Sequence, residues 1–180
     1  MGPTLETERL ILRPPIQADF DAWAAFSADA EAMRFIGGTA PRPVAWRTMA
    51  YVTGSWSLLG FGMFSVIEKA SGRWIGRLGP IHPDGWPGDE VGWGLAREAW
   101  GKGFATEGAS AAMDYAVDVL GWSDIIHTIA PNNHASAALA RRLGSTLRGA
   151  GILPALFADE PVDIWGQTAD EWRARRFAQR

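Results

Sequence analysis

The stretch "LAREAWGKGFATEGASAAMDYAVDVL", residues 95–120, joins a predicted strand to a predicted helix through a glycine-rich turn. Gly101 and Gly103 flank Lys102 in this turn, and an alanine-rich helix is predicted from about Ala105. Glycine suits such a turn because a side chain blocks close approach of a ligand or forbids left-handed torsion angles. Backbone N–H groups that converge at a helix N-terminus bind anions. The stretch therefore predicts a phosphate-binding turn.

Two common phosphate-binding motifs fit this turn poorly. A Walker loop ends in Gly-Lys followed by Ser or Thr, whereas here Lys102 lies between the glycines and Gly103 follows it. A dinucleotide fingerprint needs a third glycine, where this chain has Thr106, and an acid on the next strand, where it has "SDIIHTI". A protein that binds ATP or NAD through Lys102 stays a minor alternative.

The elements outside the turn predict a mixed α/β sheet. Alternating hydrophobicity predicts strands and the 3.6-residue period predicts helices, with glycine and proline between them. The expected order is β-α-α-β-β-β-α-β-α-β-β. The predicted ranges are 9–14, 19–36, 44–59, 61–68, 73–81, 89–96, 105–120, 123–131, 132–144, 145–153 and 161–167. Without a repeat or a linker, residues 1–180 are expected to form one domain.

Composition excludes several classes of function. The 180 residues are 47% hydrophobic and 21% charged, which is typical of a folded domain, and the net charge of −3 predicts no nucleic-acid footprint. The absence of cysteine removes disulfides, thiolate metal sites and thiol nucleophiles. The three histidines lie in separate segments, so no metal site is expected. The charged N-terminus and the lack of an apolar run of ~20 residues predict a cytoplasmic protein without a membrane partner.

Three segments carry a resemblance to a known family. "WGKGFATEGA" resembles the acetyl-CoA pyrophosphate loop of GNAT N-acetyltransferases, in particular their RimJ/RimL-type branch. "LETERLILRP" and "APNNHASAALARRLGS" resemble the opening and the Pro-x-Asn-x-x-Ser segment of that branch, and "DEW" (170–172) lies where its last strand and turn often end. One position departs from the motif, because Glu98 replaces its first Gln or Arg.

The resemblance implies a GNAT-type fold, a mixed and mostly antiparallel sheet flanked by helices. It also implies acetyl-CoA as co-substrate, with its pyrophosphate on the turn. The residues implied to contact the coenzyme are Leu95, Trp100, Gly101, Lys102, Gly103, Phe104, Ala105, Thr106 and Asn133.

Glu90 is the first candidate for the base that deprotonates an amine. The two-residue period of "DEVGWGLA" places Glu90, Gly92 and Gly94 on one face, where the glycines are expected to leave open space. GNAT relatives often have a general-base glutamate at this position. A solvated carboxylate, or relay of the proton through Asp89 or a water, is an equally open alternative. His127 is a rival base, although a lone histidine among isoleucines is more often a core residue.

The other two chemical roles have weaker candidates. A backbone N–H near Gly94–Leu95 is expected to polarise the acetyl carbonyl, and the resemblance implies that this strand splays from the strand at 123–131. The tyrosine that many GNAT enzymes use to protonate the thiolate is absent, so the resemblance leaves Ser136. Asn133 is expected to cap the helix through the N–H of Ser136, with coenzyme binding as a second role.

The acceptor is the least defined part of the site. Trp46 and Trp86, with Trp56, are candidates for an aromatic wall, although tryptophans more often pack in cores. Asp84, Asp159 and Glu160 are candidate charges that attract an ammonium group, or ordinary loop charges. The expected acceptor is a peptide N-terminal α-amine, and a small-molecule amine is the nearest alternative. A silent CoA-binding domain stays open, as does the choice between monomer and homodimer.

Overall fold

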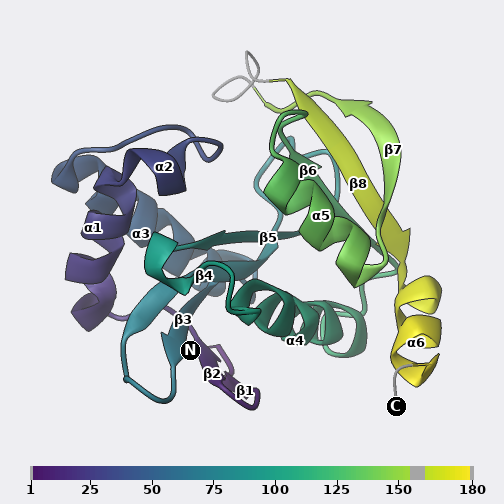
Figure 1. The fold of residues 1–180 in the computed structure, drawn as a ribbon, viewed down its shortest axis with the longest axis horizontal. Coiled ribbons are helices and arrows are strands. Elements are labelled where there is room, and N and C mark those ends of the chain that lie inside the picture. The colour runs from purple at the N-terminus through teal and green to yellow at the C-terminus, as the bar shows by residue number, and fades with distance from the viewer. Residues whose placement is uncertain (1, 155–160, 179–180) are drawn as a thin grey trace.

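The computed structural model describes residues 2–154 and 161–178, which form one eight-stranded sheet with helices on both faces (Figure 1). The strand order is β1-β2-β3-β4-β5-β6-β8-β7. The strands are β1 (Leu5–Glu6), β2 (Leu10–Arg13), β3 (Phe64–Glu68), β4 (Trp74–Ile81), β5 (Glu90–Leu95), β6 (Asp124–Ile129), β7 (Thr146–Gly151) and β8 (Val162–Thr168). The helices are α1 (Phe20–Ala28), α2 (Ala30–Met33), α3 (Arg42–Leu58), α4 (Phe104–Asp118), α5 (His134–Leu143) and α6 (Ala169–Ala178). Two short 3₁₀ turns are η1 (Gln17–Asp19) and η2 (Arg97–Ala99).

The sheet is antiparallel except at its centre. Strands β1 to β5 pair in sequence as antiparallel neighbours, and β8 lies antiparallel between β6 and β7. The parallel pair is β5–β6, because α4 carries the chain back across the sheet between these two strands. The predicted mixed, mostly antiparallel sheet is confirmed.

The two sheet faces have separate apolar layers. On one face α1, α2 and α3 cover a cluster around Trp23, Phe26 and Trp74, where the Trp74 ring lies 5.8 Å from the Trp23 ring and 5.6 Å from the Phe26 ring. On the other face α4 packs its alanine-rich side against β2, β4 and β5. Figure 1 shows the helices α1–α3 grouped apart from α4 and α5.

The helix predicted over 19–36 is wrong in its bounds. It is two helices, because Asp29 has an extended backbone and its carboxylate accepts hydrogen bonds from the N–H groups of Glu31 and Ala32, which caps α2. Asp19 makes no cap for α1. Its carboxylate instead binds Arg13 with both oxygens, at 2.7 Å each.

Besides the two 3₁₀ turns, one strand and one α-helix were not predicted. Strand β1 has two residues, too few to show a period. Helix α6 begins where residues 170–172 were expected to end the last strand and turn. It docks because Trp172 is buried and donates a hydrogen bond of 2.9 Å to Asp114 on α4, while Arg176 binds Asp114 and Asp118. These partners lie 58 residues or more earlier in the chain, so local sequence could not show them.

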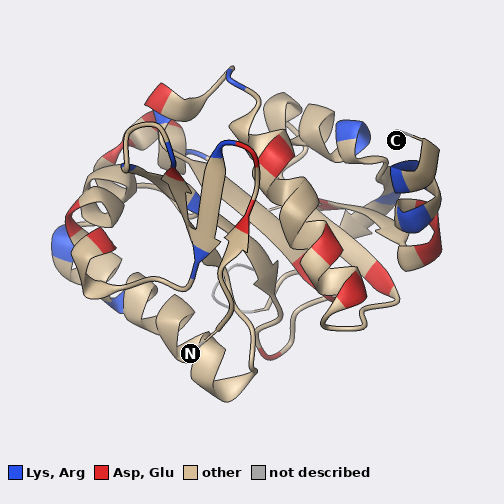
Figure 2. Cartoon of the chain, turned by 90° about the horizontal axis from the view of Figure 1, so that it is seen from below, with Lys and Arg blue, Asp and Glu red and all other residues tan. Residues whose placement is uncertain are grey.

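Charges and apolar segments are ordinary for a globular protein. In Figure 2 the acidic and basic residues are interspersed over the elements, apart from a group of basic residues close to the C-terminus. Within residues 2–154 and 161–178, no helix is long and apolar enough to span a membrane.

Gly76 fixes how closely β4 approaches β5. It has φ +153°, and a Cβ added there would lie 2.5 Å from the carbonyl oxygen of Gly94 and 2.8 Å from Cα of Leu95. We expect Gly76→Ala to lower the free energy of unfolding by about 1–3 kcal/mol, because the backbone of β5 must shift. Gly54 in α3 has nothing within 4 Å of an added Cβ. Gly54→Ala should therefore raise stability by about 0.5–1 kcal/mol. Urea unfolding measures both variants, and equal effects of the two would contradict this account.

Candidate functional site

The sheet opens between β5 and β6. The strands share one register pair, Glu90 with Ile126, and the Ile126 N–H donates a 2.9 Å hydrogen bond to the carbonyl of Asp89. The next N–H that faces β5, that of Thr128, donates to Glu90 Oε1 at 3.1 Å instead of to a backbone carbonyl. The two strands therefore part immediately after Glu90, as the resemblance implied.

Beyond this point β5 has a free backbone edge. The carbonyls of Val91 and Leu95 lie on the side away from β4, because they accept hydrogen bonds from His127 Nδ1 (2.7 Å) and Trp100 Nε1 (2.8 Å). In a strand the N–H and C=O of one residue point the same way, with a period of two residues. The N–H groups of Trp93 and Leu95 therefore face the opening, beyond the one register pair that joins β5 to β6.

Glu90 lies at the apex of the opening, with 4% of its surface exposed. Its carboxylate accepts hydrogen bonds from Trp86 Nε1 (2.6 Å), Thr128 Oγ1 (2.9 Å) and Thr128 N (3.1 Å). Burial raises the pKa of Glu90 to about 7, although these hydrogen bonds oppose the shift. A carboxylate with a pKa near neutral suits proton abstraction from an amine.

The space beside Glu90 is narrower than the sequence suggested. A Cβ at Gly92 would lie 3.4 Å from both Glu90 Oε1 and Met63 Cε. A Cβ at Gly94 would lie 3.0 Å from Ile36 Cδ1 and 3.2 Å from a ring carbon of Phe26. Open space beside both glycines was the wrong expectation, because the α1–α3 layer packs against the strand at Gly94.

The two rivals for the base have other partners. His127 is buried, its Nδ1 bonds to the carbonyl of Val91 and its Nε2 to Ser145 Oγ (3.0 Å). Burial lowers the pKa of His127 to about 4, so its ring is neutral and structural. The Asp89 carboxylate lies 2.6 Å from His82 Nδ1, whereas the Glu90 carboxylate bonds to Trp86 and Thr128.

The glycine turn forms a nest of N–H groups at the start of α4. Gly101 has φ +71° and Gly103 has φ +81°, and nothing lies within 4 Å of a Cβ added at Gly101. The N–H groups of residues 101–106 make no hydrogen bond to the described residues. Free N–H groups and the helix dipole together favour an anion at this position.

The turn is held from β2 by an arginine that the sequence analysis missed. Arg9 Nη1 donates 2.9 Å to the carbonyl of Lys102, and its Nε donates 2.6 Å to Glu107 in the first turn of α4. Its guanidinium also lies 4.7 Å from the centre of the Phe104 ring. The resemblance of "LETERL" to the family's opening was the available signal, but it carried no role for Arg9.

Glu98 points out of the nest. Its carboxylate lies 3.3 Å from Arg73 Nη2 on the surface. The departure of Glu98 from the family motif therefore leaves the backbone groups of the nest unchanged.

Ser136 lies across the opening from β5. Its N–H donates to Asn133 Oδ1 at 3.1 Å, so the predicted cap is confirmed. Its Oγ accepts a 3.1 Å hydrogen bond from Trp93 Nε1, which leaves the hydroxyl hydrogen available to donate. The Trp93 ring, 4.8 Å from that of His127, thereby spans from β5 to α5.

The chain is similar to known proteins in sequence and in fold. The family model for the acetyltransferase (GNAT) domain matches residues 9–146. The N-acetyltransferase p20 of Bacillus licheniformis is 33% identical over 149 residues, which cover 81% of this chain and 84% of that protein. The chain belongs to the GNAT acetyltransferases. The predicted family and its RimJ/RimL-type branch are confirmed.

Solved structures agree with this assignment. The acetyltransferase from Agrobacterium tumefaciens str. C58 has a TM-score of 0.83 at 32% identity and covers 93% of this chain and 95% of its own. RimL, the ribosomal L7/L12 alpha-N-protein acetyltransferase, has a TM-score of 0.76 at 16% identity over 93% and 95% of the two chains, which shows the same fold.

The three tryptophans proposed for the acceptor wall separate in this acetyltransferase. Trp56 is a core residue, because its indole N–H donates to the carbonyl of Met63 and its ring lies 4.9 Å from that of Phe64, so its proposed place in the wall is wrong. Trp46 is 48% exposed and packs edge-on against Phe20. Trp86 alone contacts Glu90. Of the proposed loop charges, Asp84 is exposed, and Asp159 and Glu160 lie outside the described residues.

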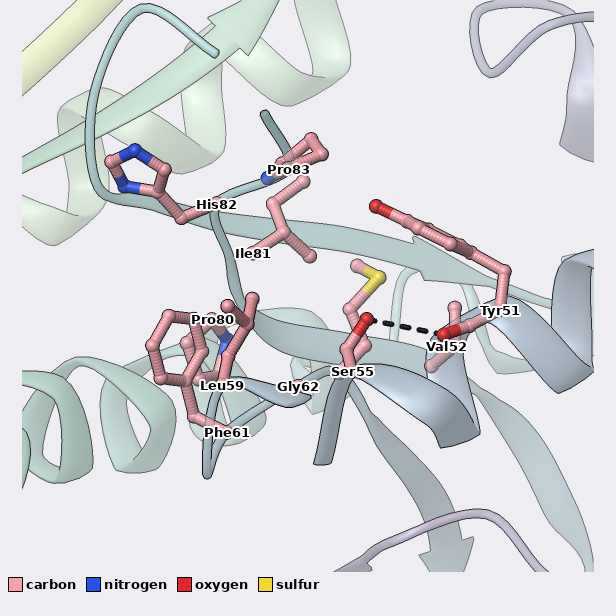
Figure 3. Close-up of a pocket in the computed structure, with 11 residues that line it drawn as sticks. Tyr51, Val52, Ser55, Leu59, Phe61, Gly62, Pro80, Ile81, His82 and Pro83 are labelled. Atoms are coloured by element: carbon pink, nitrogen blue, oxygen red, sulfur yellow. Dashed lines mark hydrogen bonds between the residues drawn. The ribbon is translucent and has the colours of Figure 1, made fainter. Parts of the chain in front are cut away.

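A small hollow lies on the Glu90 face of the sheet, between α3 and the end of β4. It is lined by residues that include Tyr51, Met63 and Ile81. Figure 3 shows Tyr51 reaching from α3 toward Ile81 and Pro83 across this hollow. Ile81 is the register partner of Glu90, so the hollow and the carboxylate are neighbours.

Gly101 and Gly121 allow a matched test of the nest. Both have φ near +70° with nothing within 4 Å of an added Cβ, at +71° and +72°. Each change to alanine should lower the free energy of unfolding by about 1–2 kcal/mol through the left-handed torsion. Only Gly101→Ala should weaken CoA binding, by ~10-fold or more, which is about 1.4 kcal/mol. Calorimetric titration with CoA checks this, and equal affinities of the two variants would remove the nest from the binding site.

The raised pKa of Glu90 predicts how stability depends on pH. The folded pKa of about 7 exceeds the ordinary 4.5, so the stabilising contribution of Glu90 is complete below about pH 4.5 and is lost as pH rises through 7. We expect the free energy of unfolding of Glu90→Gln, taken relative to that of the unmodified protein, to increase by roughly 2–3 kcal/mol as the pH rises from 5 to 8. Urea unfolding at both pH values measures this difference. The exposed Glu98→Gln is the control, and a pH-independent difference for Glu90→Gln would show that its pKa is ordinary.

Proposed function

We propose that this protein transfers the acetyl group of acetyl-CoA to a primary amine by direct attack in a ternary complex. The observation that carries the proposal is a buried carboxylate with a pKa of about 7 at the point where β5 and β6 part. Acetyl-CoA supplies an activated acetyl group when bound. The residues of this chain fit it, because the nest at 101–106 offers free N–H groups for a pyrophosphate.

Each step of the transfer has a group on this chain. Glu90 accepts the proton of the incoming ammonium, so that nitrogen has a free electron pair. The Leu95 N–H, on the open edge of β5, donates to the acetyl carbonyl oxygen and stabilises negative charge there. Ser136 Oγ–H donates toward the departing thiolate, since the Trp93 indole already fills one of its acceptor positions. As the C–N bond forms and the C–S bond breaks, the nitrogen loses its second proton and the thiolate gains a proton by way of the Ser136 hydroxyl.

The coenzyme-binding residues are assigned to the nest and its flanks. They are Leu95, Trp100, Gly101, Lys102, Gly103, Phe104, Ala105, Thr106 and Asn133. The support is the line of free N–H groups, the positive end of α4 and the exposed side chain of Lys102. Arg9 fixes the backbone of Lys102 by donating a hydrogen bond to its carbonyl.

Protein or peptide N-terminal α-amines are the first acceptor class to test. The support is the RimJ/RimL-type branch and the likeness to RimL, which is described as an alpha-N-protein acetyltransferase. A small-molecule amine is the second class, supported by the small size of the hollow beside Ile81. Ionisation of the buried Glu90 near neutral pH destabilises the fold. This cost serves catalysis, whereas CoA binding alone in a silent domain does not require it.

The decisive variant is Glu90→Gln. It removes the base and keeps the shape of the side chain, so we expect kcat to fall ~10²–10⁴-fold while the Kd for CoA stays constant. The rate of the unmodified enzyme should rise with pH through about 7 and then level off, because Glu90 acts in its ionised form. Acetyl transfer to a panel of peptides and small amines measures both effects.

Glu98→Gln is the matched control, because it makes the same change at an exposed carboxylate in η2, beyond the other end of β5. Unchanged turnover in Glu90→Gln would reject Glu90 as the base. Strong CoA binding without turnover on any amine would favour the silent domain.

A further inference from the structure

An arginine shares the sheet face of Glu90. In the β4–β5 register, Ile81 is opposite Glu90 and Arg77 is opposite Gly94. Residues directly opposite each other in an antiparallel pair have side chains on the same face. Arg77 and Glu90 therefore lie on one face, at the two ends of a segment whose centre is Gly92.

Arg77 has no carboxylate partner in the described part of the chain. Its Nη1 lies 3.1 Å from Met63 Sδ, a weak acceptor, and its Cζ lies 5.4 Å from the centre of the Trp23 ring. Its Nε is buried and makes no hydrogen bond. Burial lowers the pKa of Arg77 to about 10, against the opposing effect of Tyr51, so the group is still a cation at neutral pH. Arg77 is thus a half-buried cation whose buried Nε has no acceptor, and a buried donor without an acceptor destabilises the fold unless a ligand supplies one.

The other carboxylate on this face is already satisfied. Ser65 is the β3 register partner of Arg77, and its Oγ donates 2.7 Å to Asp19 Oδ2. Asp19 also binds both Nη groups of Arg13, so hydrogen bonds hold the pKa of Asp19 below its ordinary value despite burial. The carboxylate of Asp19 is thus committed to Arg13 and cannot serve Arg77.

Met63 and Ile81 lie over Gly92, between Arg77 and Glu90, and Met63 is the more flexible of the two side chains. A Cβ at Gly92 would lie 3.4 Å from Met63 Cε and 3.4 Å from Glu90 Oε1, so the methionine methyl lies over the glycine between the two charged groups. Met63 also lines the hollow that Tyr51 borders (Figure 3). Methionine adapts its rotamers at low energy, so an incoming molecule can displace it.

We infer that Arg77 binds a carboxylate of the acceptor, and that the acceptor is an amine that bears this carboxylate a few bonds from its nitrogen. The inference rests on the proposed function, because Glu90 must receive the amine. Glu90 and Gly94, the position opposite Arg77, are four residue steps apart along β5, roughly 13 Å between their Cα atoms. The two long side chains extend into this interval from its ends, so a short amino-carboxylate bridges them. A guanidinium and a carboxylate pair through two parallel hydrogen bonds, which would satisfy the buried Nε.

Such a carboxylate has two sources: a free amino acid, or an acidic side chain next to the N-terminus of a peptide. The first arm of the test compares α-, β- and γ-amino acids with their primary amides. The second arm compares C-terminally amidated peptides whose second residue is Glu with the same peptides carrying Gln. In the unmodified enzyme we expect kcat/KM to be ~10–100-fold higher for the carboxylate member in one arm, which identifies the source.

Arg77→Gln should remove this preference and leave kcat/KM for the amide member within ~3-fold. Arg77→Lys keeps the charge without the planar fork, so it should restore only part of the preference. Arg34→Gln is the matched control, because Arg34 is an exposed arginine at the end of α2 and pairs with Glu31. It should leave the preference intact. Thermal unfolding with and without CoA reports whether each variant is folded.

Acetylation of amides and acids at equal rates by the unmodified enzyme overturns the inference, even if Arg77→Gln does not fold. An equal loss on both members in Arg77→Gln also overturns it, because that result indicates a structural role. In both cases acetyl transfer itself continues and the proposed function stands. No transfer to any amine, with CoA still bound, rejects the proposed function instead.

Discussion

The site depends on a single structural constraint, the separation of β5 from β6 after the pair formed by Glu90 and Ile126. A buried strand edge must find partners for its N–H and C=O groups, because unpaired polar groups destabilise the fold. Here the Thr128 N–H is satisfied by the Glu90 carboxylate, and the carbonyls of Val91 and Leu95 by two aromatic side chains. Two acceptors of the edge are thus filled, and the N–H groups of Trp93 and Leu95 face the opening.

The same arrangement explains the electrostatics of Glu90. Its carboxylate replaces a backbone carbonyl in the ladder, so it must lie inside the sheet and lose water, and this burial raises its pKa to about 7. Donors from Thr128 and Trp86 oppose the shift, and without them the carboxylate would be protonated well above neutral pH. Structure and acid–base chemistry are therefore set by the same three hydrogen bonds.

The sequence predicted those features that local patterns determine. The glycine nest, the Asn133 cap and the order of the central elements follow from turn chemistry and periodicity over a few residues. It missed contacts between distant segments: Arg9 at the nest and Trp172 of α6 on Asp114. Residue type at a single position cannot show such pairs. The expectation of space at Gly94 failed for the same reason, because the residues that fill it come from the α1–α3 layer.

In the proposed reaction, strand β5 keeps the two substrates apart because its side chains point alternately to the two faces of the sheet. The side chains of Glu90 and Arg77 lie on the sheet face that α1–α3 cover, and the Trp93 side chain lies on the face that α4 and α5 cover. An acceptor on the first face and a coenzyme in the gap beside β5 meet only where the strand has no neighbour, at the opening after Glu90. The amine must approach there with its charged end already near a base. In the proposed binding mode, Arg77 lies on the acceptor face away from the gap and orients the molecule by its other end, so that one short face of β5 both selects the acceptor and positions its nitrogen.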